Sequence, residues 1–357
     1  MSHTNKESRG SVENKKQIID KVFERTTNKK HIHESILLVE NTSGDFSYSK
    51  KYGGKDLDTP FLLASITKLC TTACVFILME QGKLSLDDLL SKYIQENTLS
   101  NLHTYKGNDY SRHLTIYHLL TQTSGLPDIS EEGIALLRNN FIHKDTYIDF
   151  DEIIKLTKQQ KPHFSPTSNK RAHYACVNFD LLGKIIENIT QSPLHEVYKQ
   201  FIFDPLELNK TYLPESARDL IPEVYYKDTA IHRPQSIKSA KASGGIISNA
   251  RECMVFIKAF FNGKLFNQAI FNELKETKNL QFSMFPIRYS AGYMFISLGG
   301  LANLFMGKGE LMGHSGSTGS FAFYYPRQDL FFVGDVNQMS NSALPVRLAM
   351  QLAMGMK

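Results

Sequence analysis

The segment Ser65-Ile66-Thr67-Lys68 pairs a hydroxyl with an amine at a spacing that suits catalysis. Residues three apart lie on one face of a helix, so the amine of Lys68 can reach the hydroxyl of Ser65. Serine becomes a nucleophile when a base removes its proton, and a lysine kept neutral by a buried, positively charged environment can be that base. A helix start also favours negative charge on Ser65. The alternative interpretation is a helix cap beside an unrelated lysine.

A second candidate is Tyr174, which lies in the segment His173–Asn178 at the start of an apolar helical pattern. A tyrosine at such a junction can place its phenol in a cleft. Cationic neighbours would lower its pKa from about 10 and make the phenolate a usable base. The alternative is a packed tyrosine whose hydroxyl is hydrogen-bonded.

A third candidate is Gly313-His314-Ser315-Gly316-Ser317. Small residues at a strand edge let a substrate approach backbone N–H donors closely. A competing interpretation is the nucleophile elbow Gly-x-Ser-x-Gly with Ser315 as nucleophile. That motif needs glycine where this chain has Ser317, and it needs a helix after the strand, whereas the residues that follow are typical of a strand.

Helices must position the first two motifs. Residues 65–80 are apolar nearly all round, which predicts a helix buried on every side that ends at Gly82. Amphipathic patterns predict a first helix over 16–28 and a last one over 341–353. Further helices are expected at Leu86–Tyr93, Ile116–Leu120, Ile153–Lys158, Phe179–Ile189 and Leu194–Phe203.

Strand patterns concentrate at the two ends of the chain. Ser35–Val39 and Phe46–Tyr48 flank a turn and predict an antiparallel hairpin. Later strands are expected at Gly244–Ser248, Tyr289–Ser297, Ser320–Tyr325 and Leu330–Asp335, the last two joined by a turn at Pro326–Asp329. Together these patterns predict an α+β fold, an antiparallel sheet flanked by helices with an inserted all-helical domain.

The expected domain organisation follows from the same patterns. Residues 1–14 are polar and are expected to form a disordered basic tail. Residues 15–82 and 236–357 would form an α/β domain with a central antiparallel sheet, and 83–235 a mainly helical domain.

Composition and charge exclude several classes of protein. Hydrophobic residues make up 41% of the 357 and charged residues 22%, which is ordinary for a globular chain and excludes wholesale disorder. The net charge of +5 arises mainly in residues 1–30, which hold eight Lys and Arg against four Asp and Glu. The remainder is nearly balanced, so no nucleic-acid partner is expected.

Targeting and cofactor signals are also absent from the sequence. The first residues contain no apolar signal segment and no stretch is long enough to span a bilayer, so we expect a cytoplasmic protein without a membrane partner. The four cysteines form no zinc pattern, and His31 and His33 lack a well-placed third ligand. No phosphate loop or dinucleotide fingerprint is present, so we expect no cofactor and no metal.

The three motifs, in this order and spacing, resemble the serine β-lactamase and penicillin-binding-protein superfamily. The resemblance is to the class C β-lactamase-like branch, which includes DD-carboxypeptidases, D-aminopeptidases and esterases. It extends from about residue 35 to 337 and is supported by residues 82–88, 114–127, 203–206 and 242–251.

This resemblance implies a role for each motif. Ser65 would be the acylated nucleophile, Lys68 its proton partner, and Tyr174 the base that activates Ser65 and later the deacylating water. His314 occupies the position of a lysine in other members. The backbone N–H groups of Ser65 and Ser317 would form the oxyanion hole, beside Gly316.

One position departs from the family pattern. The second motif is Tyr-x-Asn in the family, and this chain has Cys176 in place of the asparagine. A thiol is a weak donor and acceptor and replaces an amide poorly, and Asn178 would lie elsewhere on the helix. We therefore expect a serine hydrolase that acts through an acyl-enzyme on a small ester, amide or peptide, as an esterase or D-amino-acid peptidase rather than an efficient β-lactamase. The alternative is a non-catalytic member that binds an acyl or peptidyl ligand.

Overall fold

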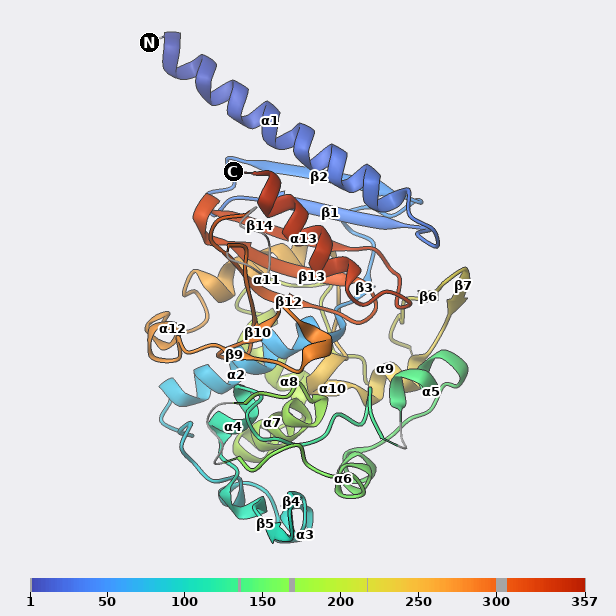
Figure 1. Cartoon of the computed structure of the whole chain (residues 1–357), viewed down its shortest axis with the longest axis vertical. Helices are drawn as coiled ribbons and strands as arrows, with labels where there is room; N and C mark the ends of the chain where they lie inside the picture. Colours follow the sequence, from blue (N-terminus) through green and yellow to red (C-terminus); the bar gives the residue numbers. More distant parts are fainter. Residues whose placement is uncertain (1, 134–135, 167–170, 217, 300–306, 357) are drawn as a thin grey trace.

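The computed structural model describes residues 2–133, 136–166, 171–216, 218–299 and 307–356. Its largest element is an eight-stranded sheet in the order β2-β1-β14-β13-β12-β11-β10-β9, in which neighbouring strands are antiparallel (Figure 1). The strands are β1 (Ser35–Glu40), β2 (Ser47–Tyr52), β9 (Lys278–Asn279), β10 (Arg288–Tyr289), β11 (Met294–Ser297), β12 (Glu310–Ser315), β13 (Ser320–Tyr325) and β14 (Leu330–Asp335). Because β1 pairs with β14, the two ends of the chain share this sheet.

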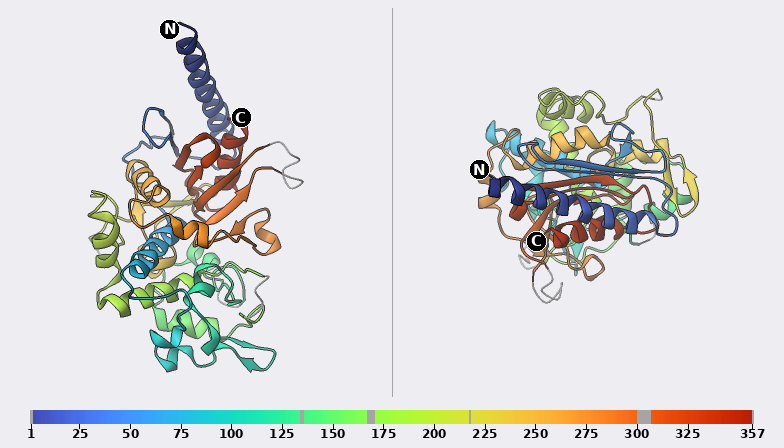
Figure 2. Two further views of the ribbon diagram at one scale, coloured as in Figure 1. Left: turned by 90° about the vertical axis from the view of Figure 1, so that its left-hand side faces the viewer. Right: turned by 90° about the horizontal axis from the view of Figure 1, so that it is seen from above.

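Helices cover both faces of the sheet. Helices α1 (Ser2–Thr27) and α13 (Leu344–Gly355) lie on one face and α11 (Ala250–Phe261) lies on the other (Figure 2). Helix α1 was expected only over residues 16–28. In the structure α1 also includes residues 2–14, which were expected to form a disordered basic tail.

The middle of the chain is mainly helical and lies below the sheet in Figure 1. Its helices are α2 (Thr67–Glu80), α3 (Glu96–Leu99), α4 (Ile116–Leu120), α5 (Leu137–His143), α6 (Phe150–Lys158), α7 (Cys176–Thr190), α8 (Leu194–Tyr198), α9 (Pro234–Ser239) and α10 (Lys241–Gly244). Short segments join them: η1 (Ala64–Ile66), η2 (Leu90–Lys92), η3 (Ser111–His113), η4 (Lys199–Phe203), β3 (Phe61–Leu62), β4 (Thr104–Tyr105), β5 (Asn108–Asp109), β6 (Val224–Tyr226), β7 (Thr229–Ile231) and β8 (Ile247–Ser248). The remaining elements are α12 (Ala269–Glu273), η5 (Phe282–Met284) and η7 (Pro326–Gln328). The α+β class is confirmed, while the domain boundaries at 82 and 236 stay a prediction.

Of the predicted strands, one is divided in the structure and another is shortened. Residues 289–297 form β10 and β11 instead of one strand, because Gly292 adopts a φ of +79° and turns the chain. Only the end of 244–248 is a strand, β8, because the residues before it close the short helix α10. Strand β12, by contrast, had not been predicted as a separate strand.

Two predicted helices also differ. At Leu86–Tyr93 only a short 3₁₀ turn forms, because the Asp88 carboxylate accepts hydrogen bonds from the Ser85 N–H and the Tyr93 hydroxyl, which favours a turn. Residues 194–203 form one α-helical turn, α8, followed by the π-helical segment η4.

Helix α2 matches its prediction closely. Its side chains are buried on nearly every side from Thr67 to Phe76, and it packs against α7, α10 and η4. Because Lys68 is the second residue of α2, the fold places an amine inside the hydrophobic core.

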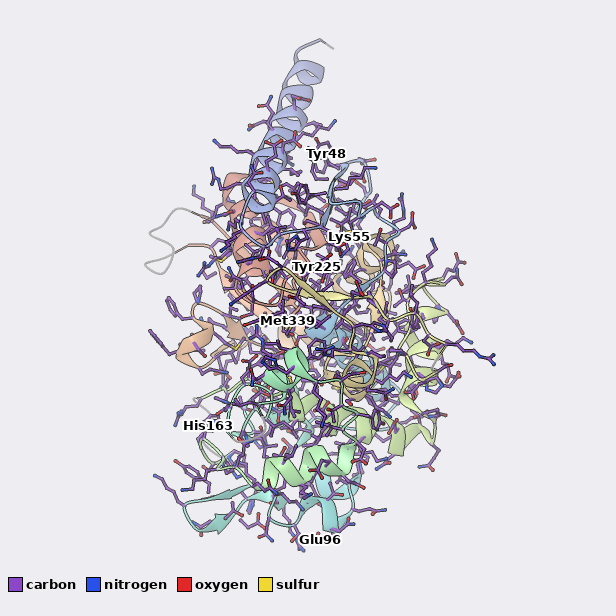
Figure 3. All side chains as sticks on the ribbon, turned by 90° about the vertical axis from the view of Figure 1, so that its right-hand side faces the viewer. Tyr48, Lys55, Glu96, His163, Tyr225 and Met339 are labelled. Carbon is purple, nitrogen blue, oxygen red and sulfur yellow. The ribbon has the colours of Figure 1, made fainter. Side chains whose placement is uncertain are left out.

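A buried ion pair holds the segment that leads to α2. The Lys55 Nζ lies 2.6 Å from the Asp335 carboxylate and 2.9 Å from that of Glu34, and the side chains of Lys55 and Asp335 are each 2% exposed (Figure 3). Burial raises the pKa of Asp335, and Lys55 acts in the opposite direction. A few residues further on, the Leu63 carbonyl accepts a hydrogen bond from Ser320 of β13 at 2.8 Å. The sheet thus fixes the chain just before Ser65.

Replacing Lys55 with methionine should destabilise the fold strongly, because it leaves a buried carboxylate without its cationic partner. We expect Lys55→Met to lower the free energy of unfolding by about 3–5 kcal/mol at neutral pH, measured by urea denaturation. The loss should be smaller in acid, where Asp335 takes up a proton in the folded variant.

The control is Lys50→Met, since Lys50 forms a more exposed pair with Asp20. That change should cost no more than about 1 kcal/mol. Equal losses in the two variants would show that the buried pair has no special role.

Candidate active site

Ser65 and Lys68 meet as their spacing predicts. The Lys68 Nζ lies 3.1 Å from the Ser65 Oγ, and the lysine is fully buried. Ser65 belongs to the short turn η1 and directly follows Ala64, which has a φ of +46°. A left-handed alanine is strained, and such strain is often found at functional sites.

The amine of Lys68 contacts further groups that come from distant parts of the chain. It donates to the Ser243 carbonyl at 2.6 Å and approaches the Cys176 Sγ at 3.6 Å. It also lies 5.1 Å from the ring centroid of Tyr174. These contacts fix the amine between Ser65 and the start of α7.

The charged groups nearest to Lys68 are acidic. Asp128 and Asp180 line the same cavity as Ser65. Burial raises the pKa of Asp128 to about 6 and that of Asp180 to about 7, and Lys68 acts in the opposite direction on both. The positively charged environment invoked from the sequence is therefore not found among the described residues.

Tyr174 presents its hydroxyl without a partner. The phenol oxygen is buried and makes no hydrogen bond with any described residue, while the backbone N–H is held by the Gln281 side chain at 2.9 Å. Burial raises the pKa of Tyr174 well above 10, Cys176 raises it further, and the nearby Ser65 hydroxyl lowers it without forming a hydrogen bond of normal geometry. The phenol is therefore protonated at neutral pH, contrary to the expectation that cationic neighbours would favour phenolate.

Gly316 brings the end of β12 against the turn that carries Ser65. A Cβ at this position would lie 2.8 Å from the Leu63 carbonyl oxygen and 2.2 Å from the Ser320 Oγ. Only glycine fits such an approach without a shift. Ser65 and Ser317 both line one cavity as a result. Their assignment as oxyanion-hole donors stays a prediction.

The nucleophile-elbow interpretation of Ser315 is wrong. Ser315 ends β12, and the chain turns directly into β13 rather than into a helix. Its hydroxyl faces the sulfur of Met294 at 3.7 Å, which is not a base.

His314 does not reach the cavity. It is fully buried, with its Nδ1 2.9 Å from the Ser315 carbonyl oxygen and its Nε2 3.5 Å from the Tyr289 hydroxyl. Burial lowers the pKa of His314 to about 3, so the ring is neutral and cannot supply the charge of a lysine. The ring centroids of His314 and Tyr289 each lie 6.0 Å from that of Tyr174, which gives them a supporting position behind it.

Cys176 lines the cavity and Asn178 does not. Burial raises the pKa of Cys176 to about 12, so the thiol is neutral, and its backbone N–H donates to Asp128 at 3.3 Å. Asn178 is fully buried and bonds Ser124 and Gln122, in agreement with the expectation that it could not replace the missing asparagine.

The cavity beside Ser65 has a volume of about 770 Å³. Its wall combines apolar side chains with charged ones at several points. The apolar side chains include Ile148, Met284, Phe285, Ile287, Met294 and Met350, and the charged ones include Asp128, Glu131, Arg138, Lys144, Asp180 and Arg347. A small organic molecule with an apolar body and polar groups fits such a site.

The sequence analysis missed several residues of this site: Asp128, Asp180, Ser243, Gln281 and Tyr289. The sequence did contain a signal for Asp180, because this residue follows Cys176 by four positions and must share its helix face. The others reach the site through tertiary contacts that leave no local pattern. His31 and His33 both contact Asp228, at 2.8 and 3.1 Å, and none of the three lines the cavity.

In the part of the chain that the structure describes, no helix has the length and apolar character needed to cross a membrane.

Comparison with curated proteins gives two kinds of relative. Protein flp of Staphylococcus aureus strain MW2 is 32% identical over 209 residues, which is 55% of this chain and 38% of that protein. The D-alanyl-D-alanine-carboxypeptidase/endopeptidase AmpH of Escherichia coli K12 is 26% identical over 216 residues, 60% of this chain and 52% of AmpH. The matches thus cover about half of each relative or less.

Solved structures share the fold at low sequence identity. The D-amino acid amidase of Ochrobactrum anthropi SV3, in complex with D-phenylalanine, superposes with a TM-score of 0.76 at 18% identity, covering 97% of this chain and 99% of that one. The hydrolase EstCE1, described as having promiscuous acyltransferase activity, gives 0.76 at 16% identity with the same coverage. A D-stereospecific amidohydrolase from Streptomyces sp. gives 0.71 at 22% identity, covering 94% and 97%.

The family model described as Beta-lactamase matches residues 27–353, nearly the whole chain and all three motifs. The resemblance seen in the sequence is therefore confirmed, and the chain belongs to the beta-lactamase family.

Proposed function

We propose that this chain is a serine hydrolase that forms an acyl-enzyme at Ser65 and acts on small esters and amides. The observation that carries the proposal is the 3.1 Å contact between the Lys68 amine and the Ser65 hydroxyl at the wall of a large cavity. A nucleophile and a base within hydrogen-bond reach are the minimum requirement for this chemistry.

Acylation begins when Lys68 takes the proton of Ser65. The Ser65 Oγ then attacks the substrate carbonyl carbon, and the backbone N–H groups of Ser65 and Ser317 stabilise the negative oxygen that forms. Tyr174 is protonated and its hydroxyl makes no hydrogen bond with a described residue, so it is placed to donate a proton to the leaving group. Lys68 returns the first proton to Tyr174, which leaves the acyl-enzyme and the released alcohol or amine.

Deacylation uses the same groups in reverse. A water molecule takes the place of the leaving group and attacks the acyl carbon. As it does so, Tyr174 accepts its proton and passes its own phenolic proton to Lys68. Ser65 recovers its proton as the acid product leaves. His314 and Tyr289 contribute by holding the Tyr174 ring from behind.

The carboxyl groups of the cavity indicate which class of ester or amide substrate would bind. Its carboxyl groups, Asp128 and Asp180, favour a substrate that carries a positive charge near the acyl carbon, such as an amino-acid ester or amide. The shared fold with a D-amino acid amidase and with EstCE1 is consistent with both bond types. Cys176 disfavours β-lactams, whose amide side chain the family asparagine would bind.

Ser65 is expected to be the residue that reacts. Treatment with a fluorophosphonate or β-lactam probe should add one adduct to the wild type, seen by intact-mass analysis, and none to Ser65→Ala. The matched control is Ser315→Ala, which removes a serine of the same cavity and should label like the wild type.

Labelling that survives in Ser65→Ala would remove Ser65 from its proposed role. A wild-type protein that takes up no probe and hydrolyses no ester would instead support a non-catalytic, ligand-binding member of the family.

Lys68 is expected to act as the proton acceptor. Lys68→Ala should lower the acylation rate by several orders of magnitude, because it removes the base. Lys68→Arg should not restore activity, since a guanidinium group does not deprotonate in a protein. Stopped-flow acylation measures the rate, and circular dichroism checks that both variants fold. An active Lys68→Arg would refute the role.

Cys176 is expected to favour esters over amide-bearing substrates. The wild type should turn over activated esters such as p-nitrophenyl acetate faster than cephalosporins or D-Ala-D-Ala peptides. Cys176→Asn should raise kcat/KM for amide-bearing substrates by about 1–2 kcal/mol of transition-state stabilisation, the scale of one neutral hydrogen bond. Ester turnover should change little, because the ester does not use that contact.

The two substrate classes control for each other, since both depend on Ser65, Lys68 and Tyr174. An equal change for both in Cys176→Asn, or fast cephalosporin hydrolysis by the wild type, would overturn this interpretation.

A further inference from the structure

Three side chains outside the proposed catalytic machinery gather at one point of the helical part. The His163 Nε2 lies 2.8 Å from one carboxylate oxygen of Glu132, and the His173 Nε2 contacts the other. The two imidazole rings stack with their centroids 3.7 Å apart and their planes at 27°. One atom from each residue lies within 4.8 Å of the others, the only such trio among the described His, Cys, Asp and Glu residues.

The backbones of these residues are fixed by one neighbouring segment. The His163 N–H donates to the Gly125 carbonyl at 2.8 Å, and the His173 N–H donates to the Gln122 carbonyl at 2.9 Å. The Glu132 carboxylate also accepts from the Asp128 N–H at 3.1 Å. The three side chains therefore converge because their backbones hold them there, which is the preorganisation that a metal site requires.

We propose that Glu132, His163 and His173 form a binding site for a divalent transition-metal ion of the zinc type. Two imidazole nitrogens and one carboxylate oxygen are a donor set that suits zinc and not Mg²⁺ or Ca²⁺, which prefer oxygen ligands. An ion among them would replace the two hydrogen bonds from the histidines to Glu132. The three ligands leave a fourth position for water.

A metal ion could reach the three side chains from solvent. The side chains of Glu132 and His163 are 30% and 31% exposed, whereas that of His173 is 10% exposed. An ion can enter from solvent and is then held on the inner side by a nearly buried ligand. Figure 3 shows His163 in the helical part, well separated from Lys55 beside the sheet.

A bound ion would hold together two segments that contribute residues to the proposed active site. Glu132 follows Asp128, and His173 precedes Tyr174. Neither of those neighbours would bind the ion, so the role assigned to it is to hold the two segments together, and it takes no part in the hydrolysis. Binding should consequently stabilise the folded chain, because the ion binds the folded state alone.

The test uses the full chain without an affinity tag, stripped of metal with a chelator. Titration with Co²⁺ should produce the visible absorption of a four-coordinate ion at one equivalent, and Zn²⁺ should displace it. Zn²⁺ should also raise the Tm. His163→Ala and Glu132→Gln should each weaken binding of either ion at least about tenfold and abolish the shift in Tm.

Two controls make the result specific. His31→Ala/His33→Ala removes the other histidine pair that shares a carboxylate, and it should bind Co²⁺ like the wild type. Ser65→Ala should also bind normally, so failure of the proposed hydrolase chemistry would not affect this result. The Tm of each variant without metal shows whether it is folded.

Loss of binding in His31→Ala/His33→Ala but not in His163→Ala would place the metal elsewhere and overturn the proposal. Absence of Co²⁺ absorption in the folded wild type would do the same and would leave the trio as a hydrogen-bonded His–Glu–His network.

Discussion

The arrangement of the site depends on one constraint, the burial of the Lys68 amine within the core. A buried amine must find acceptors, because an unsatisfied one would cost several kcal/mol. The turn η1 just before α2 supplies the Ser65 Oγ. The remaining contacts come from Cys176 at the start of α7 and from the Ser243 carbonyl in α10. Helices far apart in the sequence must therefore converge on the start of α2, and that convergence creates the wall on which the nucleophile lies.

The electrostatic balance of the site follows from the same burial. Asp128 and Asp180 place two carboxyl groups on the cavity wall. Burial raises the pKa of Asp128 to about 6 and that of Asp180 to about 7. Such perturbed groups are typical of functional sites. Tyr174 and His314 are shifted in the directions that keep both uncharged. Tyr174 and His314 therefore serve as a neutral proton carrier and a neutral support, while Asp128 and Asp180 are the groups whose pKa lies near neutral pH.

The sequence predicted the local parts of this arrangement and missed the non-local ones. The contact between Ser65 and Lys68 follows from helical spacing, and the burial of α2 follows from its apolar pattern. The position of His314 could not be predicted, because the side of β12 that faces the cavity depends on how the strand pairs with β11 and β13. Likewise, the pKa of Tyr174 depends on how deeply tertiary packing buries it, which no motif encodes. Gly292 was overlooked as a turn because an isolated glycine in a strand pattern has several meanings.

The strain at Ala64 shows how the sheet and the helical part act together. A left-handed alanine costs on the order of 1–3 kcal/mol and persists only where its surroundings determine it. Here the Leu63 carbonyl is held by Ser320 of β13, and Gly316 lets β12 approach the same turn more closely than any side chain would allow. The strained turn points Ser65 at both Lys68 and the cavity. The sheet thus contributes no catalytic side chain to the pair, but its two central strands set the direction in which the nucleophile faces.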